Sequence, residues 1–318
     1  MPELPEVETI ARGLAARVSR DVIESVWLGA KPEPFKSPAR KIALTLENSR
    51  IVAVRRMGKH IVFDLTRDTV ARTLPSTGSA QALSSKSQRI KRGSHLRAST
   101  AMQPEADKNN VHPTQTDPAQ ITAQWIVHLG MTGRLQVCEP QSEILKHTHA
   151  IVKLASGREL RFVDPRRFGR LSVSLDFDAV GIEPLEVDLD SFIRLFRGRK
   201  TPIKSALLNQ KLLRGVGNIY ADESLFRAGI RPRRRASTIP REKLAGLLDS
   251  IKEVLREAIA LGGSSISDYV DADGEAGFFQ LQHRVYGREG EPCLVCKTPI
   301  KRIVIAGRSS HYCPTCQK

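Results

Sequence analysis

The sequence lacks any apolar run that approaches the roughly 20 residues needed to span a membrane, and no signal-peptide pattern opens it. Acidic residues are few relative to basic ones: 34 Asp and Glu stand against 50 Lys and Arg, and the formal net charge is +16. We therefore expect a cytoplasmic protein rather than a membrane-spanning one. The excess of positive charge predicts a polyanionic partner, for which nucleic acid and an anionic membrane surface both qualify.

Cysteine is also rare, but four of the five cysteines fall in the last 26 residues. They form two Cys-x-x-Cys pairs, Cys293/Cys296 and Cys313/Cys316, with 16 residues between the pairs. This spacing is typical of a structural zinc site in which four thiolates close a tetrahedron. Two disulfides are the alternative, which a reducing compartment disfavours. We expect one structural Zn²⁺, whose binding energy would order a tail too short to order itself by core burial.

The amino terminus carries a candidate nucleophile. Removal of Met1 would leave Pro2 as a secondary amine, and an α-amino pKa of about 7.7–8 keeps roughly a tenth of such a group as free base at neutral pH. Glu3 is a carboxyl group directly beside it. An amine next to a carboxyl acid/base is the minimum set for Schiff-base chemistry on a sugar or carbonyl carbon. The alternative interpretation is an ordinary capped helix over about residues 5–18.

The apolar pattern divides the first half of the chain into two kinds of segment. Short alternating runs within 22–66 and 125–175 predict about eight strands, one of them at 42–46, and favour a two-sheet β-sandwich behind the amino-terminal helix. Residues 67–123 contain no aromatic residue and are rich in small and polar residues. They predict a disordered insertion.

After residue 180 the pattern becomes helical. Residues 181–187 resemble a linker, and a long amphipathic helix is expected between Pro240 and Gly262. Three shorter helices are predicted, at 191–197, 204–212 and 218–228. The last thirty residues return to short strands around the cysteines. The sequence thus predicts an α+β chain made of a sandwich, a helical domain and a zinc hairpin.

Five motifs then stand in a fixed order: Met1-Pro-Glu-Leu-Pro-Glu-Val-Glu-Thr9, His128-Leu-Gly-Met131, Asp164-Pro-Arg-Arg-Phe-Gly169, Gly215-Val-Gly-Asn-Ile-Tyr-Ala-Asp-Glu223 and the four-cysteine tail. Together they closely resemble bacterial formamidopyrimidine-DNA glycosylase, over nearly the whole chain except 67–123. The resemblance implies a monomeric, nucleoid-associated enzyme of base excision repair. It implies the following parts: a catalytic sandwich domain at 1–180, a helix–two-turn–helix DNA-binding domain at 188–285 and a zinc finger at 286–318.

The activity that the resemblance implies is that of a DNA glycosylase and AP lyase. It would excise 8-oxoguanine and formamidopyrimidines from damaged double-stranded DNA and cut the strand by β,δ-elimination. Pro2 would attack the sugar C1′ and Glu3 would be its acid/base partner. Lys59 would contact the phosphate beside the lesion and assist elimination, and Arg308 would grip the flanking phosphates. Further DNA contacts are implied for Met131, His147, Arg166, Phe168, Lys200, Lys204 and Asn218.

Met131, Arg166 and Phe168 would fill the space left by the extruded base, and the segment 268–282 would close over that base. Plainer interpretations stay open for some residues: Lys59 as a strand-edge lysine and Asn218 as a helix cap. Two other functions also stay open. One is an endonuclease VIII-like glycosylase for oxidised pyrimidines, and the other is a non-catalytic zinc protein that binds DNA.

Overall fold

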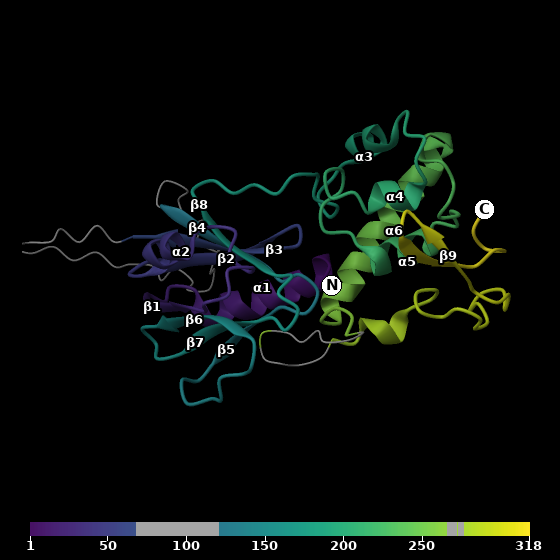
Figure 1. The fold of residues 1–318 in the computed structure, drawn as a ribbon. Helices are drawn as coiled ribbons and strands as arrows, with labels where there is room; N and C mark the ends of the chain where they lie inside the picture. Colours follow the sequence, from purple (N-terminus) through teal and green to yellow (C-terminus); the bar gives the residue numbers. More distant parts are fainter. Residues whose placement is uncertain (68–120, 266–271, 273–276) are drawn as a thin grey trace, which may run out of the picture. The chain divides into compact units, whose positions relative to one another are not determined.

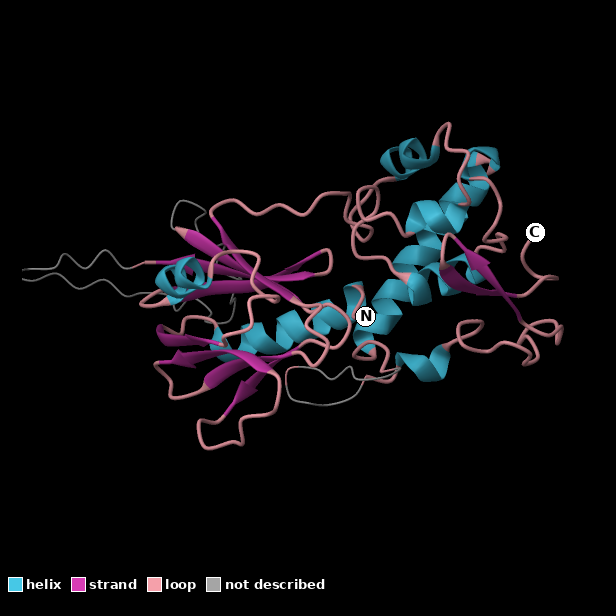
Figure 2. Cartoon of the chain, viewed as in Figure 1, coloured by secondary structure: helices cyan, strands magenta, loops and turns pink. Residues whose placement is uncertain are grey.

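The structure is a computed structural model of the 318-residue chain and describes residues 1–67, 121–265, 272 and 277–318 (Figure 1). The predicted insertion therefore lies almost wholly outside the described residues, as does most of the segment 268–282. Within the described ranges, strands dominate the amino-terminal part and helices the carboxyl-terminal part (Figure 2). No helix in these ranges is both long and apolar enough to cross a bilayer.

Two four-stranded antiparallel sheets form the amino-terminal part, in the strand orders β1-β6-β7-β5 and β2-β3-β4-β8. Helix α1 (Leu4–Val18) runs along both sheets (Figure 1). Its buried residues share one apolar core with Phe63 of one sheet and Phe162 of the other. The predicted sandwich with an amino-terminal helix is confirmed. The strands are β1 (Ile23–Leu28), β2 (Arg50–Met57), β3 (His60–Thr66), β4 (Ala123–His128), β5 (Arg134–Cys138), β6 (Thr148–Leu154), β7 (Glu159–Val163) and β8 (Arg170–Ser174).

The strand predicted at 42–46 is wrong, because these residues belong to helix α2 (Ala39–Leu46). The apolar residues at 42, 44 and 46 alternate, which is the pattern of a strand. In the helix, however, Ile42 and Leu46 lie four residues apart on one face and are fully buried, whereas Leu44 is 57% exposed. The pattern of five residues was too short to distinguish the two periods.

The helical part packs its own core around Tyr220, Phe192 and Phe279. Leu4, the first residue of α1, belongs to this second core rather than to the core of the sandwich. The start of α1 is thereby fixed inside the helical part, where α5 begins. The elements are α3 (Leu189–Phe196), α4 (Ile203–Leu207), α5 (Asn218–Arg227), α6 (Arg241–Ala260) and the 3₁₀ helices η2 (Ala236–Thr238) and η3 (Phe279–Gln282). Helix α4 ends before the predicted residue 212.

The chain closes with a two-stranded antiparallel hairpin of β9 (Lys301–Ile305) and β10 (Arg308–Tyr312). Its apolar core is small: Phe226, Val285 and Ile300 pack with the buried Cys293 and Cys313. So little apolar surface cannot hold two strands by itself. The cysteines at the end of the hairpin therefore matter for its stability.

Candidate active site

Pro2 and Glu3 are buried at the start of α1. Met1 precedes Pro2 in the sequence, so the nitrogen of Pro2 becomes a free amine only when Met1 is removed. The backbone N–H of Glu3 donates to Oε2 of Glu6 at 2.7 Å, and the N–H of Leu4 donates to the carbonyl of Gly215 at 3.0 Å. These bonds fix the terminus against the Gly215–Asn218 turn.

The carboxyl group of Glu3 lies at the first turn of α5, where the backbone N–H of Ile219 donates to Oε1 at 3.3 Å. A Cβ atom on Gly217 would lie 2.5 Å from Oε2 of Glu3, so a glycine is needed for this approach. Burial raises the pKa of Glu3 to about 7, against the opposing effect of Lys59. Such a carboxyl group can donate or accept a proton near neutral pH.

Lys59 occupies the two-residue turn between β2 and β3 and is only 8% exposed. Burial lowers its pKa, the charge of Glu3 raises it and the charge of Arg308 lowers it further. Glu3 and Arg308 therefore each lie within electrostatic reach of Lys59. The structure brings together the four residues for which the sequence predicts catalysis, with Pro2 next to Glu3.

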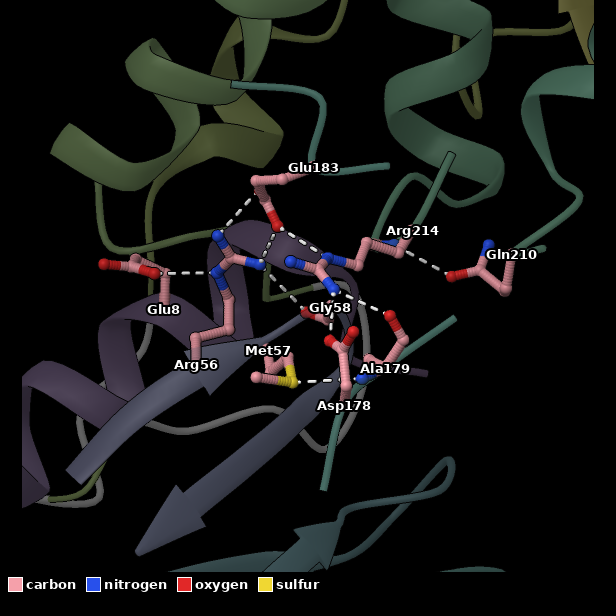
Figure 3. A network of polar contacts seen from close by, with 10 residues as sticks. Glu8, Arg56, Met57, Gly58, Asp178, Ala179, Glu183, Gln210 and Arg214 are labelled. Atoms are coloured by element: carbon pink, nitrogen blue, oxygen red, sulfur yellow. Dashed lines mark hydrogen bonds and ion pairs between the residues drawn. The ribbon is translucent and has the colours of Figure 1, made fainter. Parts of the chain in front are cut away.

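A network of charged side chains supports this turn (Figure 3). The Arg56 guanidinium donates to Glu8 at 2.7 Å, to both oxygens of Glu183 at 2.8 and 3.0 Å, and to the carbonyl of Gly58 at 3.3 Å. Arg214 reaches the same Glu183 carboxylate at 3.4 Å. Glu183 belongs to the predicted linker and Arg214 precedes Gly215. The network therefore ties the Lys59 turn to the turn that receives the amino terminus. No sequence pattern predicts this network, because no motif spacing relates residues 56, 183 and 214.

The predicted DNA contacts divide into exposed and buried residues. His147, Lys200 and Arg308 are exposed, whereas Lys204 has no exposed surface. The Lys204 ammonium forms an ion pair with Asp222 at 2.7 Å. In this structure it does not reach the surface, where a phosphate contact would have to be made.

The proposed void-filling residues lie on two loops that touch. Met131 is 42% exposed and Phe168 is 47% exposed, although both are large and apolar. The Arg166 guanidinium lies 4.8 Å from the centre of the Phe168 ring. A Cβ atom on Gly130 would lie 2.5 Å from the backbone of Gly169, so the two loops are in close contact. The arrangement presents an apolar wedge beside a cation.

Two buried groups near the site were not predicted. Glu6 accepts hydrogen bonds from the Tyr220 hydroxyl and from the backbone N–H of Ser264 at 2.8 Å, in addition to that of Glu3. Burial raises its pKa. His128 accepts from the N–H of Gly130, and burial lowers its pKa to about 4, which leaves the ring neutral at pH 7. The only sequence signal for either residue is its membership of a motif, the amino-terminal motif for Glu6 and His128-Leu-Gly-Met131 for His128.

The four cysteines of the tail bring their sulfur atoms within 4.8 Å of one another. Cys293 and Cys313 are buried and the other two are half-buried. Four thiolates in one cluster fit a single Zn²⁺, and a site closed in this way leaves no position for substrate.

Comparisons with known proteins agree with these observations. Residues 1–116 and 108–171 match the formamidopyrimidine-DNA glycosylase N-terminal domain, and residues 180–270 match the H2TH domain of the same enzymes. Residues 290–318 match the zinc finger found in FPG and IleRS. The predicted zinc finger and the predicted α+β organisation are thereby confirmed.

Whole-chain relatives lead to the same family. Formamidopyrimidine-DNA glycosylases of Solibacter usitatus and Gluconobacter oxydans are 41% and 37% identical over 100% of both chains. The crystal structure of the MutM (Fpg) protein from Thermus thermophilus has a TM-score of 0.74 at 35% identity and covers 99% of this chain and 98% of its own. A Lactococcus lactis Fpg solved with DNA that contains an abasic site has a TM-score of 0.77 at 28% identity, with 99% of each chain covered. The chain belongs to the formamidopyrimidine-DNA glycosylase family.

Proposed function

We propose that this chain is a bifunctional DNA glycosylase and AP lyase that excises 8-oxoguanine and formamidopyrimidines from duplex DNA. One observation supports this most directly. The amino-terminal Pro2-Glu3 pair is buried against the start of α5 within electrostatic reach of Lys59, which is itself within electrostatic reach of Arg308. A nucleophilic amine, a carboxyl group near neutrality and two cations are the groups needed to attack a sugar that is flanked by phosphates.

The chemistry follows from these groups. Once Met1 is removed, the Pro2 nitrogen attacks C1′ and the bond from C1′ to the base breaks. The electron pair of that bond leaves on the base, which takes up the proton that the Pro2 nitrogen loses. Glu3 donates a proton to the sugar ring oxygen, the ring opens and a positively charged iminium forms. The iminium acidifies the protons on C2′, so β-elimination breaks the bond to the 3′ oxygen and δ-elimination breaks the bond to the 5′ oxygen. The lowered pKa of Lys59 fits a group that assists proton transfer here.

The proposed DNA surface uses the exposed cations. Arg308, Lys200 and His147, together with Asn218 at the start of α5, would contact phosphates, as the net charge of +16 favours. The wedge of Met131, Arg166 and Phe168 would enter the stack when the damaged base leaves it. Lactococcus lactis Fpg has been solved with DNA that contains Fapy-dG or an abasic site, which supports the same partner for this chain. We propose that it acts as a monomer.

Borohydride trapping tests the mechanism. Protein whose mass shows that Met1 is removed should be captured covalently on a duplex with 8-oxoguanine opposite cytosine, and Pro2→Gly should lose most of that capture. A protein that only binds DNA would give no capture in either form. A matched duplex with thymine glycol separates the endonuclease VIII-like alternative, because a preference for the glycol would refute the proposed substrate class.

A further inference from the structure

We propose that the buried Lys204–Asp222 pair positions Arg308 and that Lys204 acts through this pair rather than by touching DNA. The inference rests on the proposed function, because it concerns the arginine that would grip the phosphates beside the lesion. It makes Lys204 and Asp222 positioning residues.

The first observation is the set of contacts around Asp222. This residue of α5 has no exposed surface, and neither has Lys204, whose ammonium lies 2.7 Å away. The same carboxylate accepts from the Ser310 hydroxyl at 3.1 Å and from the backbone N–H of His311 at 2.8 Å. One side chain of α5 thus holds two successive residues of β10.

The second observation is that two side chains hydrogen-bond to Ser309, the residue next to Arg308. The Lys204 ammonium donates to the backbone carbonyl of Ser309 at 2.6 Å. The Asn218 amide donates to the hydroxyl of the same serine at 3.3 Å. Side chains from α4 and α5 therefore fix the backbone immediately after Arg308, while the Arg308 side chain stays exposed.

The position of β10 explains why the backbone beside Arg308 needs these contacts. Its last residue, Tyr312, precedes the zinc ligand Cys313, so the metal fixes one end of the strand. Arg308 lies at the other end, next to the exposed turn at Ala306 and Gly307. A two-stranded hairpin is marginal by itself. The buried pair therefore holds the strand between Arg308 and the zinc ligand, at Ser309, Ser310 and His311.

Charge distinguishes this role from a direct phosphate contact. Lys204 is already neutralised by Asp222, so it adds little attraction for DNA. If Lys204 bound a phosphate, removing the charge of Asp222 would free its ammonium, and DNA affinity would hold or rise. If the pair positions Arg308, removing either partner lowers affinity only while Arg308 is present.

The test measures affinity for a duplex that carries an uncleavable abasic-site analogue, by fluorescence anisotropy across a range of salt concentrations. Arg308→Ala should weaken binding on the order of 10- to 100-fold and lower the salt slope by about one unit. Asp222→Asn and Lys204→Met should each approach this loss. Neither should weaken binding or lower the slope further when combined with Arg308→Ala.

Matched variants distinguish a specific effect on Arg308 from a general loss of folded protein. Ser310→Ala removes one contact of Asp222 and leaves the buried ion pair with Lys204 intact. Its smaller loss of affinity should also vanish in the Arg308→Ala background. Glu159→Gln changes another buried ion pair, with Arg161 in the sandwich, and should leave affinity unchanged. Zinc content should remain at one ion per chain in every variant.

Two outcomes would overturn the inference while leaving the proposed function intact. One is a double variant of Arg308→Ala with Asp222→Asn, Lys204→Met or Ser310→Ala whose loss of DNA affinity is the product of the two single losses. The other is tighter DNA binding by Asp222→Asn than by the unaltered protein. If the unaltered protein fails to bind the damaged duplex, the proposed function itself is wrong.

Discussion

One methyl group added at Gly217 tests whether the position of Glu3 matters for catalysis. Gly217 precedes α5 with φ −130° and ψ −161°, a backbone conformation that alanine adopts freely. The new Cβ atom, however, would lie 2.5 Å from Oε2 of Glu3. The backbone of Glu3 is fixed by its bond to Glu6 and by the bond from Leu4 to Gly215. We therefore expect the carboxyl group to swing away while the terminus stays in place.

The size of the effect on the rate follows from these distances. A relaxed contact needs about 3.5 Å, so Oε2 must move by roughly 1 Å, and Oε1 and Cδ of Glu3, which lie nearer to the new Cβ atom, must move farther. A misplacement of about 1 Å can cost about 10²-fold in rate, and general acid–base catalysis contributes about 10²- to 10⁴-fold. We expect Gly217→Ala to lower the rate constant of base excision by about 10²-fold or more. Affinity for damaged DNA should change little, because Glu3 is not one of the proposed phosphate contacts.

Single-turnover excision of 8-oxoguanine from a duplex, with enzyme in excess, measures this rate constant apart from product release. Gly246→Ala is the matched control, because a Cβ atom there meets nothing within 4 Å. That variant should keep its rate and gain up to about 1 kcal/mol of stability, since alanine favours a helix interior. An unchanged excision rate in folded Gly217→Ala would show that catalysis does not depend on where α5 places Glu3.

The remaining predictions concern pH and zinc. Because Glu3 has a pKa of about 7 and donates its proton in the proposed step, excision should decline at alkaline pH, and Glu3→Gln should lose this decline together with most of its rate. The folded-state pKa of Glu3 is about 7, above its ordinary 4.5, so ionisation of this buried carboxyl group costs stability. This cost is absent below pH 4.5 and grows as the pH rises to about 7, up to roughly 3 kcal/mol. In urea unfolding, Glu3→Gln should be more stable than the parent at pH 8 and about equally stable at pH 4.5. Removal of zinc by a strong chelator should weaken DNA binding at least about tenfold, with the loss restored by Zn²⁺, while the far-UV circular dichroism of the two larger cores is retained.

The sequence predicted elements well where the pattern was long enough to fix one period. The apolar stripe of α6 runs over about four turns, from Leu244 to Ala258, which excludes a strand. Residues 42–46 fit both the two-residue period of a strand and the 3.6-residue period of a helix. Their helical structure depends on the packing of Ile42 and Leu46 against the core, which the sequence does not show. The same limit applies to the site. Motif order indicated that Pro2 and Glu3 act together, but no local pattern shows that Gly217 makes room for the Glu3 carboxyl group.

Lys204 shows why a motif match cannot replace a structure. Its resemblance to a phosphate-binding lysine depends on residue type and order, whereas the positioning role that we propose for it depends on its burial beside Asp222 of α5. Asn218 and Asp222 lie four residues apart on α5 and therefore on one face, and both contact β10. Glu223, the next residue, accepts three backbone N–H groups from residues 284–286, at 2.8–3.0 Å. The acidic end of the Gly215–Glu223 motif thus holds the zinc finger and the segment leading into it, while the glycine end receives Glu3. If α5 aligns the amino terminus with Arg308, substitutions at the two ends of the Gly215–Glu223 motif should have different effects. Those at the glycine end should lower the rate of chemistry, and those at the acidic end should lower the affinity for DNA.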